Sequence, residues 1–311
     1  MDKAIFDKKI EESVKRCEGI FEKFLPEQKG PTKTLVEAMS YSVMVGGKRL
    51  RPILMIEAYK LFAKDMGENS VLPAEIESFA TAIEFIHNYS LVHDDLPAMD
   101  NDEFRRGRLT TWKVYGDGMG VLTGDALLNM AFEIVMNAGV KYSDDPVRLK
   151  RIVKASDVLF NKSGIHGMIG GQCADLEAEN SGKDATLGDI LYIHEHKTGC
   201  LIEASLMIGA ILGGASDEEV KKMEKAGSNV GIAFQIQDDI LDVIGDSEEL
   251  GKQTGSDAAN GKATYVTIKG IEDSEAEVKR LSKEAEELLQ ELPGDKEFMM
   301  TLIEALIGRR R

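Results

Sequence analysis

The sequence predicts an all-α protein, folded as one large helical bundle that spans residues 1–311. Ala, Glu, Lys, Leu and Met are plentiful, and long stretches repeat apolar residues at the three- and four-residue spacing of a helix buried on one side. Strand signals are nearly absent. The one notable run of β-branched residues, Thr264 to Ile268, is short. No low-complexity linker interrupts the chain, so a single domain is expected.

The best-defined helix is predicted to begin after Pro73, since proline suits the first turn of a helix, and to run to about Leu96. At 1.5 Å per residue its length is roughly 35 Å. Its buried stripe consists of Ile76, Phe79, Ala80, Ile83 and Ile86.

Three later helices are predicted to begin at capping boxes or close variants of them, in which Ser or Thr precedes an acidic residue by three positions. The pairs are Thr186 with Asp189, Ser216 with Glu219, and Ser274 with Glu277. Short loops are expected at residues 27–32, 66–73, 142–146 and 180–186.

The composition excludes several classes of protein. With 38 basic and 54 acidic residues, the net charge is −16, so a general nucleic-acid-binding surface is not expected. Cys17, Cys173 and Cys200 form no CxxC pair, which argues against a zinc site or a disulfide framework and suits a reducing cytoplasm. The N-terminus lacks the apolar core of a signal peptide, and the longest apolar stretch, 201–215, contains Glu203 and is too short for a membrane span. We therefore expect a soluble, cytoplasmic protein.

The first acidic motif has the form DDxxxxD and contains Asp94, Asp95 and Asp100. On a straight helix, residues six positions apart would point about 240° apart. Pro97 lies between Asp94 and Asp100 and should loosen or end the helix. The carboxylates are therefore predicted to converge at a distorted helix end.

The second acidic motif, DDxxD, contains Asp238, Asp239 and Asp242 and begins 238 − 94 = 144 residues after the first. Asp238 and Asp242 share one helical face. Both motifs follow apolar segments, where carboxylates are costly unless cations neutralise them. Mg²⁺ does so with oxygen ligands, and it typically bridges one or two carboxylates to substrate phosphates. The pattern predicts two opposed acidic walls that hold several ions around a polyanion; the simpler interpretation is exposed acidic clusters on an acidic protein.

Two basic clusters run against the acidic composition. One is GGKRLRP, with Lys48, Arg49 and Arg51, and the other is FRRGR, at residues 104–108 directly after the first acidic motif. Arginine forks suit bidentate binding of diphosphate, and a Gly-Gly pair lets backbone N–H groups approach an anion. Acidic and basic residues within a dozen positions predict a metal–diphosphate site.

Together these motifs identify a known family. The segments DDLPAMD with RRG, GGKRLRP, GGQCADLEAE, HKTG and FQIQDDILD resemble motifs of trans-prenyl diphosphate synthases, most closely bacterial short-chain enzymes of the farnesyl diphosphate synthase type. The resemblance covers residues 33–267. It implies ten or more helices around a deep central cavity (the isoprenoid synthase type), and a homodimer.

The resemblance also implies roles for single residues. The implied Mg²⁺ ligands are Asp94, Asp95 and Asp100 of the first motif and Asp238, Asp239 and Asp242 of the second. They would hold two or three ions, with Mn²⁺ as the alternative metal. The allylic diphosphate would contact Arg105, Lys197 and Lys252, and the isopentenyl diphosphate pocket would contain Lys48, Arg51, His87 and Arg106. Thr198 and Gln235 would stabilise the developing carbocation. Gln172 and Asp175 form an inner-wall pair in which Asp175 orients Arg105, and Lys262 lies at the cavity mouth.

The implied reaction is ionisation of the allylic diphosphate, condensation with isopentenyl diphosphate, and loss of a proton to the released diphosphate. Tyr89 and Ser90 precede Asp94 by about one helical turn. A tyrosine at that level resembles the floor of enzymes that stop at fifteen carbons. Farnesyl diphosphate is the expected product, and ten- and twenty-carbon products remain open.

Other functions remain open as alternatives. A geranylgeranyl diphosphate synthase belongs to the same family. A terpene cyclase shares the DDxxD chemistry but has no need of a second diphosphate pocket. The pair His93-Asp94 is typical of metal-dependent phosphohydrolases, which would need further histidine ligands; His194 and His196 are interpreted instead as helix-surface residues. Some relatives are inactive regulatory subunits, but both aspartate motifs are intact here. The terminal residues Arg309 to Arg311 are expected to be a solvated end or to fold over the isopentenyl diphosphate pocket.

Overall fold

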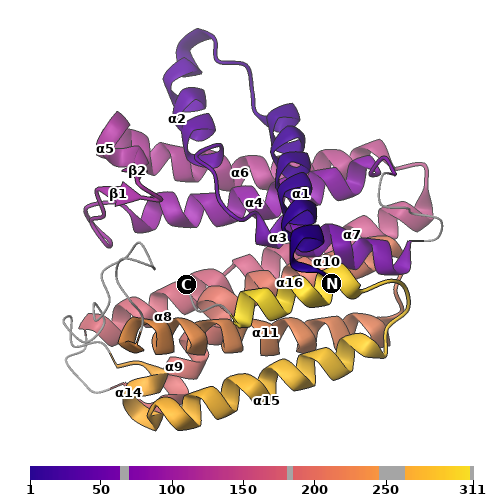
Figure 1. Cartoon of the computed structure of the whole chain (residues 1–311). Helices are drawn as coiled ribbons and strands as arrows, with labels where there is room; N and C mark the ends of the chain where they lie inside the picture. Colours follow the sequence, from indigo (N-terminus) through magenta and orange to yellow (C-terminus); the bar gives the residue numbers. More distant parts are fainter. Residues whose placement is uncertain (64–69, 181–184, 245–262, 309–311) are drawn as a thin grey trace. The chain divides into compact units, whose positions relative to one another are not determined.

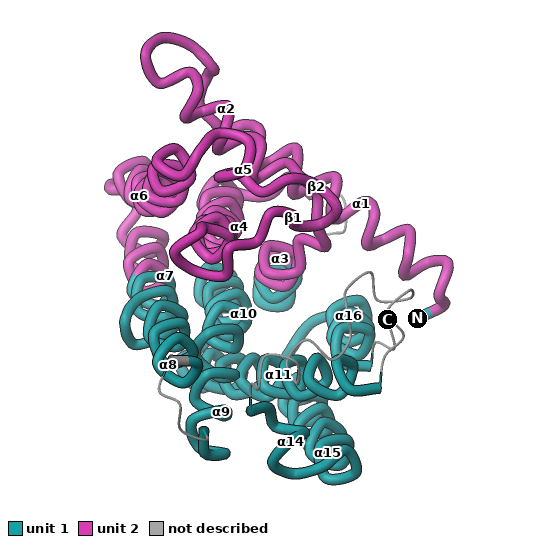
Figure 2. The backbone as a smooth tube through the Cα atoms, turned by 90° about the vertical axis from the view of Figure 1, so that its left-hand side faces the viewer, with its two compact units in different colours: residues 1, 57–65, 157–311 teal, residues 2–56, 66–156 magenta. Residues whose placement is uncertain are grey.

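The computed structural model describes residues 1–63, 70–180, 185–244 and 263–308. These residues are almost entirely helical, with more than ten helices, which confirms the all-α prediction (Figure 1). They form two compact units (Figure 2). Unit 1 comprises residues 1, 57–65 and 157–311, and unit 2 comprises residues 2–56 and 66–156. Two helices contribute residues to both units, α3 (Leu50–Phe62) and α7 (Pro146–Ser163). The single domain and the opposed acidic walls stay predictions.

Unit 2 is built around the helix that the apolar stripe predicts. This helix, α4, begins after Pro73 and ends at Asp94, and Ile76, Phe79 and Ile83 on it are fully buried. A helix that is apolar on most faces must be enclosed, and α1, α2 and α6 pack against it. The elements of unit 2 are α1 (Lys3–Phe24), η1 (Gly30–Thr32), α2 (Lys33–Val43), α4 (Ala74–Asp94), β1 (Phe104–Arg105), β2 (Arg108–Leu109), α5 (Thr111–Tyr115) and α6 (Asp117–Lys141).

Unit 1 is organised around α11, which packs against α10 and α15. The contact with the preceding π-helical segment η2 is close, because a Cβ built on Gly231 would lie 2.5 Å from the Cα of Gly199. Only glycine at position 231 allows the two backbones to approach this closely. The elements of unit 1 are α8 (Met168–Asn180), α9 (Leu187–Ile193), η2 (His194–Gly199), α10 (Cys200–Gly213), α11 (Asp217–Ile244), α14 (Tyr265–Lys269), α15 (Ile271–Gln290) and α16 (Glu297–Ile307).

Two of the three predicted capping boxes are confirmed, those at Thr186 and Ser216. The third is wrong. Ser274 lies inside α15, and its hydroxyl donates to the carbonyl of Gly270 at 2.6 Å. The helix begins one turn earlier, directly after Gly270, whose φ of 82° turns the chain into it. The β-branched run near Thr264 forms the short helix α14 rather than a strand.

Helix α6 is long and apolar enough to cross a membrane by length and composition alone. Of its most apolar 18-residue stretch, 39% is buried inside the protein. Its buried residues, among them Leu127, Ala131 and Val135, belong to a helix that packs on α4 within unit 2. A core helix of a soluble protein satisfies the same criteria. The expectation that no segment spans a membrane stays a prediction.

Candidate active site

The first acidic motif lies where α4 ends. Asp94 is the last helical residue, three positions before Pro97. The chain then turns tightly, and the backbone N–H of Asp100 donates to the carbonyl of Asp94 at 2.8 Å. Two aspartates six positions apart are therefore adjacent in space at the backbone. The predicted end of the helix before Pro97 is confirmed, and the convergence of the carboxylates stays a prediction.

Among the three aspartates of this motif, Asp95 is the buried one, with 3% exposure. Its carboxylate accepts a hydrogen bond of 2.6 Å from Nε of Arg105, and Asp102 lies 3.6 Å from the same guanidinium. Burial raises the pKa of Asp95 to about 6, although Arg105 opposes the shift. Asp95 therefore fixes Arg105; the expectation that Asp175 orients Arg105 stays a prediction. Its predicted role as a metal ligand stays a prediction.

The two basic clusters of unit 2, about 60 positions apart, meet in space. Strands β1 and β2 pair through a tight turn in which Arg106 and Gly107 have φ values of 53° and 72°. Positive φ at both central positions defines a type I′ turn. The turn directs the Arg106 guanidinium onto the carbonyl of Gly46, and a Cβ on Gly47 would lie 2.8 Å from its Cζ. Glycine at position 47 therefore leaves room for the guanidinium.

His87, on α4, lies among these cations. Burial and then the charges of four arginines (Arg51, Arg106, Arg105 and Arg49) hold the pKa of His87 well below its usual 6.5. Burial also lowers the pKa of Arg51 to about 10, with Glu84 opposing the shift and Arg106 adding to it. Within the described residues, the Nε atom of Arg51 is buried and has no hydrogen-bond partner. This surplus of positive charge and donors suits a bound anion.

In unit 1, the predicted lysine lies on the π-helical segment η2. Lys197 donates to Oδ2 of Asp175 at 2.6 Å, and Asp175 is 4% exposed. Gly171 on α8 lies directly against the Lys197 backbone, so that a Cβ there would collide with it. Short π-helical insertions often occur at functional sites. Thr198, the next residue, and Gln172 and Gln235 are half-buried, and their predicted roles stay predictions.

The second acidic motif lies near the end of α11. Asp239 accepts a 2.8 Å hydrogen bond from the backbone N–H of Tyr265, and Nε2 of His194 lies 3.6 Å from the same carboxylate. His194 is 7% exposed, so its interpretation as a surface residue is wrong. Asp238 and Asp242 are half-buried. Lys252, Lys262 and the terminal arginines Arg309 to Arg311 lie outside the described residues.

The carboxylates of the two motifs suit magnesium that is bound together with a substrate. Within the described ranges, no group of three or more His, Cys, Asp or Glu side chains could hold a metal ion by itself. Mg²⁺ is commonly bound in just this way, by one or two carboxylates together with substrate phosphates and water. Asp94 with Asp100, and Asp238 with Asp242, offer such incomplete sets.

Sequence analysis did not separate Arg49 from the other cations of its loop. The structure buries it at 2% exposure beside Glu84, which sequence analysis did not single out. Nothing in the run Lys48-Arg49 distinguishes the exposed cation from the buried one. Only the packing of the loop on α4 does so.

Comparison with known proteins places these features in context. The family model described as polyprenyl synthetase matches residues 32–303. A farnesyl diphosphate synthase of Geobacillus stearothermophilus is 41% identical over 83% of this chain and 82% of its own length. The large subunit 1 of a heterodimeric geranylgeranyl pyrophosphate synthase of Arabidopsis thaliana is 44% identical over 84% of this chain and 68% of its own. The crystal structure of a geranyltransferase from Helicobacter pylori, complexed with magnesium and isoprenyl diphosphate, has a TM-score of 0.77 and 32% identity, with 96% of each chain covered.

Proposed function

Because this chain belongs to the polyprenyl synthetase family and is a prenyltransferase that joins isopentenyl diphosphate to allylic diphosphates, we propose that its main product is farnesyl diphosphate. Dimethylallyl and geranyl diphosphates are the proposed allylic substrates. The observation that carries the fifteen-carbon product is Tyr89, a buried aromatic residue five positions before Asp94 on α4.

Substrate binding is assigned to the two sets of cations. Arg105 and Lys197 are proposed to hold the allylic diphosphate. Isopentenyl diphosphate is proposed to bind at the surplus of positive charge around His87, to Lys48, Arg51 and Arg106. The closeness of these arginines to a histidine with a depressed pKa supports this assignment.

The proposed reaction begins when the allylic C–O bond breaks and its electron pair leaves with the diphosphate. The double bond of isopentenyl diphosphate attacks the allylic carbon and forms the new C–C bond. A proton is then lost to the released diphosphate. Thr198 and Gln235 are proposed to stabilise the positive charge before the new bond forms, because the partial negative charge of their oxygen atoms can face it.

Magnesium is the proposed cofactor, held by Asp94 and Asp100 in one motif and by Asp238 and Asp242 in the other. When bound, it supplies a Lewis acid that neutralises the leaving diphosphate. The pairing of incomplete carboxylate sets with a phosphate substrate supports this proposal, as does the magnesium in the Helicobacter pylori complex. Mn²⁺ is the alternative ion.

The experiment is incubation with Mg²⁺, isopentenyl diphosphate and dimethylallyl diphosphate, followed by dephosphorylation and chromatography of the alcohols. Farnesol is the expected main product. Geranylgeraniol would instead assign the twenty-carbon activity named for the Arabidopsis relative that is 44% identical. A cyclic hydrocarbon or free phosphate alone would contradict the proposal.

We further propose a homodimer in the cytoplasm. Helix α6 supports the dimer, because it exposes the apolar side chains of Val121, Leu122, Met136 and Val140. Light scattering should give the mass of a dimer for the wild type, and Met136→Glu should shift the protein towards the mass of a monomer.

The cytoplasmic location is supported by the cysteines. All three are free, and free thiols suit a reducing compartment.

A further inference from the structure

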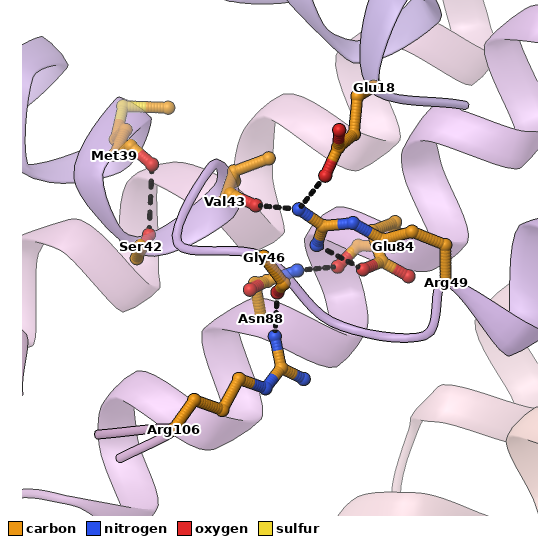
Figure 3. A network of polar contacts seen from close by, with 9 residues as sticks. All are labelled: Glu18, Met39, Ser42, Val43, Gly46, Arg49, Glu84, Asn88 and Arg106. Atoms are coloured by element: carbon orange, nitrogen blue, oxygen red, sulfur yellow. Dashed lines mark hydrogen bonds and ion pairs between the residues drawn. The ribbon is translucent and has the colours of Figure 1, made fainter. Parts of the chain in front are cut away.

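The loop between α2 and α3 contains a cation that does not face solvent. The side chain of Arg49 has 0% exposure and donates to three acceptors at once (Figure 3). These acceptors are Oε1 of Glu84 at 2.8 Å, the carbonyl of Val43 at 2.7 Å and Oε1 of Glu18 at 3.2 Å. The guanidinium also lies 5.6 Å from the ring centroid of Phe21. Arg49 thus joins its own loop to α1 and α4.

The same loop has an unfavourable backbone. Gly46 and Gly47 have φ values of 99° and 136°, which glycine tolerates, but Arg49 has φ 50°. The left-handed region is unfavourable for any residue with a Cβ, because the Cβ crowds the following carbonyl oxygen. Strained conformations of this kind persist only where surrounding contacts enforce them. The three hydrogen bonds of the Arg49 guanidinium are such contacts.

The residues beside Arg49 are those assigned to isopentenyl diphosphate. Lys48 precedes it and is exposed, and Arg51 lies in the first turn of α3. The carbonyl of Gly46 receives the Arg106 guanidinium. A change in the conformation of this loop would therefore displace three cations together. Glu84 lies three positions before His87 on the rigid helix α4, so Arg49 ties the loop to the same helix that carries the histidine.

We propose that Arg49 is a positioning residue for the isopentenyl diphosphate site, with Glu84 as its buried counter-ion. The inference rests on the proposed function, because it names what holds the cations assigned to that substrate. Arg49 does not touch substrate. Arginine suits this task because its planar fork reaches several acceptors in different directions, whereas lysine provides a point charge.

The first test is the kinetics of Arg49→Lys in the full-length protein. We expect the KM for isopentenyl diphosphate to rise by about ten- to a hundredfold, since one charged hydrogen bond to the substrate contributes roughly that factor to its affinity. The KM for geranyl diphosphate should stay within about twofold, as should kcat at saturating isopentenyl diphosphate. A buried pair with a purely structural role would instead reduce the yield of folded protein and leave both KM values alone.

A double variant separates positioning from stability. Replacing both members of a buried ion pair by apolar residues often leaves stability unchanged, whereas removing one member is strongly destabilising. Arg49→Met with Glu84→Met should therefore unfold close to the wild-type temperature and still show the raised KM for isopentenyl diphosphate. If its KM is that of the wild type, the inference is overturned.

The matched control is a second buried ion pair, in unit 1. Glu203 on α10 is 2% exposed and pairs with Lys162 on α7. Glu203→Gln should lower the unfolding temperature without raising the KM for isopentenyl diphosphate selectively. An equal rise in this control would attribute the Arg49 effect to general destabilisation and refute the inference.

Isothermal titration of each protein with isopentenyl diphosphate distinguishes the two proposals. A wild type that neither binds isopentenyl diphosphate nor forms elongated product refutes the proposed function and, with it, this inference. A wild type that does both, beside an Arg49→Lys variant of unchanged affinity, refutes the inference alone.

Discussion

Replacing Tyr89 should separate the stability of α4 from the length of the product. Its side chain is 6% exposed, and within the described residues its hydroxyl has no hydrogen-bond partner. Burial, followed by the charge of Asp94, raises the pKa of Tyr89 to about 12, so the group stays a neutral phenol. A buried polar group without a partner costs about 1–3 kcal/mol. Tyr89→Phe should therefore raise the free energy of unfolding by about 1 kcal/mol and keep the product at fifteen carbons.

Tyr89→Ala removes the ring as well. Truncating a buried phenylalanine costs about 3–5 kcal/mol, from which the relief of the hydroxyl, about 1 kcal/mol, is subtracted. The net loss is about 2–4 kcal/mol, and the product should lengthen to twenty carbons or more. Ile83→Ala is the control, because Ile83 is fully buried on α4 but, six positions from Tyr89, points about 240° away around the helix. It should be destabilising with no change of product.

Urea unfolding gives the stabilities, and chromatography of dephosphorylated products gives the chain lengths. Two results would refute the reasoning. A fifteen-carbon product from Tyr89→Ala would show that this side chain does not limit elongation. A Tyr89→Phe protein less stable than the wild type would show that the hydroxyl is stabilising rather than costly.

Three further predictions concern packing, protons and metal. Gly231→Ala should lower the free energy of unfolding by about 1–3 kcal/mol, because the added methyl group would meet the backbone of Gly199. Gly19→Ala on α1, where a Cβ would have no atom within 4 Å, should raise it by about 0.5–1 kcal/mol, and urea unfolding measures both. His87 stays neutral in the folded state, so only the unfolded chain takes up its proton as pH falls below 6.5. The difference in unfolding free energy between the wild type and His87→Gln should therefore be constant above that pH and shift against the wild type below it, measured by unfolding from pH 8 to 5. Chelation of divalent metal should abolish turnover and the binding of geranyl diphosphate but leave the binding of isopentenyl diphosphate measurable by titration calorimetry.

Several features could be predicted from the sequence because they depend on local chemistry. The apolar stripe after Pro73 predicted α4, since a helix with this period has to bury its face. Pro97 predicted the end of that helix, and the backbone contact between Asp94 and Asp100 follows from the turn. The capping boxes at Thr186 and Ser216 depend on residues within one turn.

Other features depend on contacts between distant segments. Ser274 matched a capping pattern, but the chain had already entered the helix at Gly270. His194 continues the buried stripe of Ile190 and Ile193, and its ring lies beside Asp239 of a helix more than 40 positions later in the chain. Arg105 pairs with Asp95, ten positions before it, a contact that the sequence did not single out. An acidic protein offers several carboxylates to each cation, and only the fold selects among them.

The charge of the cations explains why metal should matter for one substrate more than for the other. Arg105 is paired with Asp95 at 2.6 Å, and Lys197 is paired with Asp175 at 2.6 Å. Each pairing fixes a cation in place but also cancels much of its charge. A diphosphate proposed to bind there meets little net positive charge until metal ions arrive, so its affinity should depend on them.

The cations around His87 are balanced differently. Within the described residues, no carboxylate lies within ion-pair distance of Arg51 or Arg106. Glu84, which opposes the lowered pKa of both arginines, is already bonded to Arg49. The histidine responds by remaining neutral, which is how a group with no counter-ion avoids adding to local repulsion. A diphosphate would relieve that repulsion directly, without metal. The buried Arg49–Glu84 pair therefore has two effects: it holds the loop, and it directs the Glu84 carboxylate onto Arg49 rather than into an ion pair with Arg51 or Arg106.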